Sequence, residues 1–132
     1  MRSYSVAIAA LALDAPKKWV DNVISQHHVP LVASFSRGVG RSIPFSSLLH
    51  LAVARQLHVQ LGLGVADALR IAVALMSRNG AEAHECGELR LTVDLPRLER
   101  RLMSKLADAL ESAPSPARGR PARQSDAGRG AR

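Results

Sequence analysis

Two adjacent lysines, Lys17 and Lys18, are followed at helical spacing by the polar pair Asp21 and Asn22. Lysine ammonium groups contact DNA phosphates or guanine edges, whereas an asparagine carboxamide pairs with adenine through two hydrogen bonds. A carboxylate such as that of Asp21 can accept a hydrogen bond from cytosine. These residue types at this spacing favour a helix that reads the major groove; the alternative for the lysines is a solvated helix start.

The elements that would position these residues are a pair of short helices. An apolar stretch predicts a first helix over 6–13, with Ser5 as its N-cap. A second helix is expected over 16–26, where Asp14 would cap it and Pro16 suits the first turn and lies at the DNA-facing end. The residues expected on its buried side are Trp19, Val20, Val23 and Ile24.

A basic segment with two glycines follows and predicts a small β-hairpin. A strand at 29–35 would lead into a turn at 37–40, where glycine supplies the positive φ of a tight turn, and a return strand at 41–43. Arg37 and Arg41 would contact phosphates or enter the minor groove, the alternative being ordinary hairpin charges. Neutral phosphate donors are expected at Tyr4, Ser5 and Ser36.

Two longer helices and a strand–helix element complete the expected architecture. One helix would run from Ser46 or Ser47 to residue 61, with Gly62 at its end, and the next over 65–77. A strand is expected over 89–95, and a helix would start at Pro96. Leucines recur on that helix at every fourth position, namely Leu98, Leu102, Leu106 and Leu110. This stripe predicts a homodimer interface; packing within one chain is the alternative.

Composition and charge divide the chain into three parts. Residues 1–80 carry eight Lys or Arg against three Asp or Glu, and they form the expected DNA-binding domain. Residues 81–112 are slightly acidic and form an element for dimerisation or partner binding. Residues 113–132 carry five arginines and no core residue, which predicts a disordered basic tail that adds salt-sensitive affinity for phosphate. Hydrophobic residues make up 47% but aromatics only 3%, which favours close-packed helices.

Several classes of function are disfavoured by the same sequence. No apolar run reaches the length of about 18 residues that a membrane-spanning helix needs, so a cytoplasmic, nucleoid-associated protein is expected. His84 and Cys86 lack a second pair at zinc-site spacing, and Cys86 lacks the base of a catalytic nucleophile. We therefore expect no enzymatic activity, no cofactor and no metal site.

The order of elements over 5–76 resembles the MerR-type winged helix-turn-helix domain. The segment 40–46 is similar to the exit of the wing in that family, and 60–68 is similar to the junction between the two helices that follow. The resemblance implies a mainly α fold with a small β-hairpin wing. The chain resembles a compact member of the family that lacks the long coiled coil and the effector domain.

Taken together, these features predict a sequence-specific double-stranded DNA-binding protein, a small transcriptional regulator that acts as a homodimer. The alternative is a protein–protein adaptor or antitoxin that binds a protein partner through 81–112, with DNA binding secondary.

Overall fold

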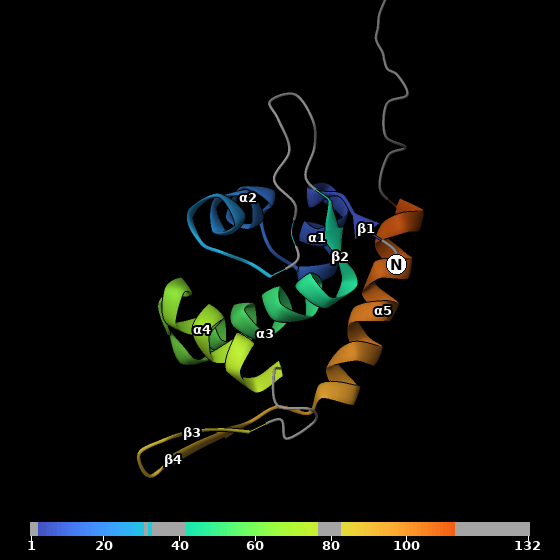
Figure 1. The fold of residues 1–132 in the computed structure, drawn as a ribbon. Coiled ribbons are helices and arrows are strands. Elements are labelled where there is room, and N and C mark those ends of the chain that lie inside the picture. The colour runs from blue at the N-terminus through green and yellow to red at the C-terminus, as the bar shows by residue number, and fades with distance from the viewer. Residues whose placement is uncertain (1–2, 31, 33–41, 77–82, 113–132) are drawn as a thin grey trace, which may run out of the picture.

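The computed structural model describes residues 3–30, 32, 42–76 and 83–112, which form a mainly helical fold with two small antiparallel strand pairs (Figure 1). In chain order the elements are β1 (Ser3–Tyr4), α1 (Val6–Leu13), α2 (Lys17–Gln26), β2 (Ile43–Pro44), α3 (Phe45–Leu61), α4 (Val65–Met76), β3 (Ala83–Cys86), β4 (Leu89–Thr92) and α5 (Leu95–Ser112).

Helix α1 occupies the centre of this arrangement and contacts α2, α3 and α5. Its sequence is apolar throughout, and a helix without a polar face is stable only where neighbours cover several of its sides. Alanines at its contact positions, among them the fully buried Ala9, let those neighbours approach closely. As predicted, Ser5 caps the helix by accepting a hydrogen bond from the Ile8 N–H at 3.2 Å.

The predicted role of Asp14 as the cap of α2 is wrong. Asp14 instead ends α1 in the left-handed conformation, with φ 56° and ψ 42°, and its N–H bonds back to the α1 carbonyls. Its carboxylate faces α5, where it accepts a hydrogen bond from Lys105 at 2.9 Å. Pro16 takes the N-cap position of α2, so that helix begins without a side-chain cap.

The predicted helix boundaries for α3 and α4 are confirmed to within one or two residues, but the serine cap of α3 is wrong. Pro44 occupies the cap position. Ser47 is fully buried, and the hydrogen bond that its hydroxyl donates to the Pro30 carbonyl offsets the loss of contact with water. Gly62 ends α3 with φ 73°, as expected for a glycine C-cap.

The strand pairs differ from the expected hairpin pattern. β2 pairs with β1 in the register Tyr4↔Ile43. The sequence pattern did not predict β1, which is an N-terminal strand. The predicted turn at 37–40 and most of the predicted strand at 29–35 lie outside the described residues. The strand expected over 89–95 is observed as the shorter β4, and α5 already begins at Leu95. β4 pairs with β3, which the sequence did not predict, through a turn that contains Gly87 with a φ of 63°.

Helix α5 shares the core of the first four helices. Leu98, Leu102 and Leu106 are buried in one cluster with residues of α1 and α3, which α5 contacts directly. These three leucines are therefore covered within one chain, as in the alternative of intramolecular packing, and are not exposed to a second copy. Leu110, the fourth of the stripe, is 43% exposed.

Candidate nucleic-acid interface

Helices α1 and α2 are joined by three residues, which matches the short turn of helix-turn-helix units. The left-handed conformation of Asp14 allows this reversal, a role that glycine often has and that aspartate tolerates better than most residues. The Ala15 N–H then bonds to the Ala10 carbonyl at 3.0 Å. The turn is thus tied to the end of α1, and α2 leaves it in a fixed direction.

Helix α2 presents a charged and polar face away from the core. Val20 and Val23 are buried beneath it, whereas Lys17, Lys18 and Asn22 are exposed. Among the residues that the structure describes, neither lysine forms an ion pair. The predicted positions of these three polar side chains on one exposed helix are therefore compatible with contact to a ligand.

The N-terminal end of α2 carries an unusual concentration of positive charge. The helix has no acidic residue in its first turn and no side-chain cap, so its first backbone N–H groups have no partner from a cap. Lys17 and Lys18 add two ammonium groups where the helix dipole is already positive, an arrangement that costs helix stability unless an anion is nearby. Phosphate groups bind well at such an end.

Two other polar positions of α2 have different environments. Asp21 is only partly exposed and interacts with another group of the chain, so it is less available to accept a hydrogen bond from cytosine than predicted. Gln26 is exposed one turn beyond Asn22, and the sequence reasoning missed it. The signal was available, because Lys18, Asn22 and Gln26 follow each other at intervals of four residues, and a glutamine carboxamide also pairs with adenine.

Trp19 attaches α2 to α3. The Arg55 guanidinium lies over the indole ring, 4.8 Å from its centroid, and the His58 ring centroid is 6.3 Å away. His58 is in turn held by a 2.7 Å hydrogen bond between its Nδ1 and the Leu63 carbonyl. The indole is thus covered by α3 side chains, which fits its predicted place on the buried side of α2.

The remaining predicted contact residues fall into two groups. The Ser5 hydroxyl is used as the α1 cap, and Tyr4 lies in β1, half-buried and engaged within the chain. Ser36, Arg37 and Arg41 lie outside the described residues. Tyr4 pairs with Ile43, which is the second residue after Arg41 in the sequence.

Within the described ranges, no three His, Cys, Asp or Glu side chains lie close enough together to hold a metal ion. No described helix is both long and apolar enough to cross a bilayer.

Comparisons with known proteins return no match to a family model, a curated protein or a solved structure. The resemblance to the MerR-type domain therefore rests on the residues and element order described above.

Proposed function

We propose that this protein binds double-stranded DNA in a sequence-dependent manner and acts as a small transcriptional regulator. The observation that carries the proposal is the α1–turn–α2 unit, whose second helix exposes a cationic N-terminal end. That end is uncapped, and neither of its two lysines is neutralised by a described acidic side chain. A surface phosphate of DNA would offset the unfavourable charge arrangement at this end.

The proposed mode of binding follows from the spacing along α2. The N-terminal end would enter the major groove first, with Lys17 and Lys18 on phosphates or guanine edges. Asn22 and Gln26 would then face base edges farther along the helix. Arg37 and Arg41 would add backbone contacts from the predicted wing, and Tyr4, Ser5, Pro16, Asp21 and Ser36 remain weaker candidates.

Homodimerisation remains part of the proposal, but with a different surface of α5. Met103 is 60% exposed and lies on the same side of the helix as Ala107 and Leu110. These three side chains line a groove of about 290 Å³ together with Tyr4, Phe45 and Leu106. This second stripe, formed by Met103, Ala107 and Leu110, is exposed, whereas Leu98 and Leu102 are buried.

Charge favours a two-fold, antiparallel pairing of two such stripes. On the helical wheel, Arg100 and Glu111 flank the same edge of the stripe and are separated by three turns. An antiparallel two-fold arrangement centred between them places Arg100 of one copy opposite Glu111 of the other. Such a dimer would present two α2 helices to the two halves of an inverted-repeat site.

A second candidate function is capture of a protein partner through 81–112. The β3–β4 hairpin lies at the edge of the molecule (Figure 1), and Leu89 in it is 73% exposed. A partner that covers Leu89 would remove this apolar side chain from water.

The experiment that tests the proposed function compares binding of the full chain to two DNA duplexes by fluorescence anisotropy. One duplex comes from upstream of the chain's own gene, and the other is a scrambled sequence of the same composition. Preference for the first duplex that persists at physiological salt supports a specific regulator. Equal binding that disappears with salt indicates only non-specific contact with phosphate and contradicts the proposal.

A charge-matched pair of variants localises the interface. K17A/K18A removes two cations from α2, and R70A/R97A removes two exposed cations from α4 and α5. The proposal expects a large loss of affinity for the first variant only. Equal losses for both would mean that net charge, rather than α2, determines binding.

A further inference from the structure

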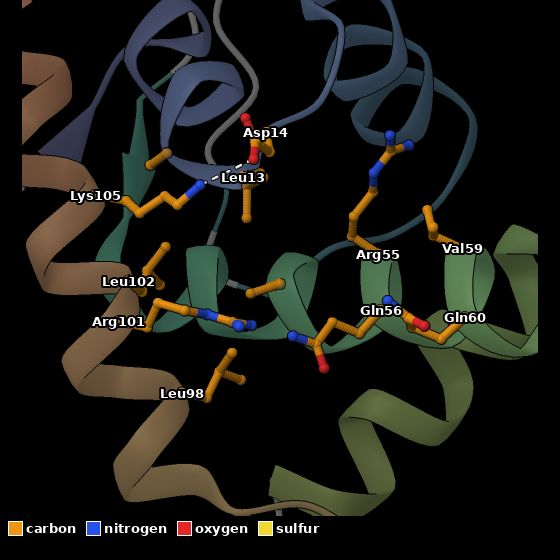
Figure 2. Close-up of a pocket in the computed structure, with 12 residues that line it drawn as sticks. Leu13, Asp14, Arg55, Gln56, Val59, Gln60, Leu98, Arg101, Leu102 and Lys105 are labelled. Atoms are coloured by element: carbon orange, nitrogen blue, oxygen red, sulfur yellow. Dashed lines mark hydrogen bonds and ion pairs between the residues drawn. The ribbon is translucent and has the colours of Figure 1, made fainter.

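A cleft of about 330 Å³ lies where the C-terminal end of α1 meets α3 and α5 (Figure 2). Its apolar surface comes from three different helices, through Leu13, Ala52, Leu98 and Leu102. The volume is in the range of small-molecule sites, and a lining that combines apolar and polar side chains suits an organic molecule better than a hydrated ion. The cleft lies beside the α1–α2 turn and is not part of the exposed face of α2.

Half of the polar residues that line the cleft are cationic. Arg101 and Lys105 extend from α5, Arg55 extends from α3, and Asp14 is the only acidic residue of the lining. Figure 2 shows Arg101 reaching from α5 toward the side chain of Gln56 on α3. Because the Arg55 guanidinium lies over the Trp19 ring, Arg101 and Lys105 are the cations of the lining that a ligand could use, against the one Asp14 carboxylate.

Two of these polar groups have unused hydrogen-bonding capacity. Within the described part of the chain, the Arg101 guanidinium forms no ion pair, and the Gln56 carboxamide forms no hydrogen bond. A guanidinium can bind a carboxylate or phosphate through two parallel hydrogen bonds, and a carboxamide N–H can donate a third. Their approach across the cleft places anion donors next to the apolar walls.

The ion pair at the upper end of the cleft can be exchanged for a ligand at little cost. Lys105 donates to Asp14 at 2.9 Å, but the Asp14 side chain is 82% exposed and that of Lys105 41%. Exposed pairs of this kind contribute little to stability, so an incoming anion can take over the ammonium group. Lys105 can therefore serve as a second cation for a ligand held by Arg101.

We propose that this cleft binds a small organic anion, with a phosphate or carboxylate group on Arg101 and Lys105 and an apolar body against Leu98 and Leu102. The proposal concerns a small molecule and is independent of DNA binding, because its test contains no DNA. The concave, partly apolar lining distinguishes the site from a contact with the DNA backbone, which needs an exposed cationic surface.

The test is a titration of the ¹⁵N-labelled full chain, followed by ¹H–¹⁵N correlation spectra. The probes are phenyl phosphate and benzoate, which distinguish phosphate from carboxylate, and phenol and inorganic phosphate serve as controls. We expect saturable shifts at the amides of cleft residues with one or both of the aromatic anions. Phenol lacks the charge and inorganic phosphate lacks the apolar body, so both are expected to bind more weakly.

Two arginine variants on the same helix make the test specific. Arg101→Gln is expected to weaken the better probe about tenfold or more, because it removes charge-assisted hydrogen bonds. Arg97→Gln removes the same charge one helical turn away, at a position that does not line the cleft, and is expected to leave the affinity within about twofold. No saturable shift at cleft amides, equal losses for both variants, or equal binding of phenol would overturn the proposal.

Discussion

Substitution of Leu102 by alanine tests whether α5 belongs to the core of a single chain. Leu102 is 4% exposed and lies in the same buried cluster as residues of α1 and α3. Truncation of a buried leucine costs about 2–5 kcal/mol, and the low end applies here because Leu102 also borders the cleft, which can admit water. A loss of about 2–3 kcal/mol corresponds to a fall in Tm of roughly 10 °C or more.

Leu11→Ala is the matched control, because it makes the same substitution in a helix of the same core at a position that is 50% exposed. Thermal unfolding of both variants is followed by circular dichroism at two protein concentrations. The destabilisation by Leu102→Ala is expected to be the same at both, since its contacts lie within one chain. A loss that appears only at high concentration would place Leu102 in an interface between copies and refute the assignment.

Further measurements address the turn, the helix end, the dimer and the base contacts. The hydrogen bond and the charge attraction from the Lys105 ammonium group lower the pKa of Asp14 below its ordinary value of 3.8. The stability that this ion pair contributes is therefore present above pH 3.8 and is lost as the pH falls below it. Asp14→Asn is expected to flatten the dependence of Tm on pH in this acid range. Gly62→Ala is expected to lower the free energy of unfolding by about 1 kcal/mol in urea titrations, because the left-handed φ of 73° disfavours a Cβ although no atom lies within 4 Å of it. Met103→Glu combined with Leu110→Glu is expected to give monomers in analytical ultracentrifugation with an unchanged far-ultraviolet spectrum; persistent dimers would place the interface elsewhere. Asn22→Ala is expected to relax the preference at one base pair by about 1–3 kcal/mol in competition binding, whereas a uniform loss over all sequences would indicate a phosphate contact.

Helix positions were largely predictable because their signals are local. Ser5 before an apolar run and Gly62 after one mark helix ends through backbone chemistry that needs no tertiary context. The apolar spacing of Val20 and Val23 likewise identified the buried side of α2. The same periodicity predicted the candidate reading surface, the exposed face of α2 with Lys17, Lys18 and Asn22, since residues opposite a buried stripe must face outward.

Features that depend on distant residues could not be predicted in this way. Aspartate is a common N-cap residue, but the Asp14 carboxylate instead accepts a hydrogen bond from Lys105, which is far away in sequence. Ser47 was expected at a helix start, yet it bonds to the Pro30 carbonyl in the core. The leucine stripe of α5 identified an apolar face correctly, but periodicity does not indicate whether that face meets the same chain or a second copy.

The position of Trp19 gives the protein a built-in optical reporter. It is the only tryptophan of the chain, and it lies on α2 between the candidate reading surface and α3. Its indole is in contact with a guanidinium and close to an imidazole, and polar neighbours of this kind alter the emission of an excited indole. Steady-state emission of the unlabelled protein therefore reports on the packing of α2 against α3, without interference from indoles elsewhere.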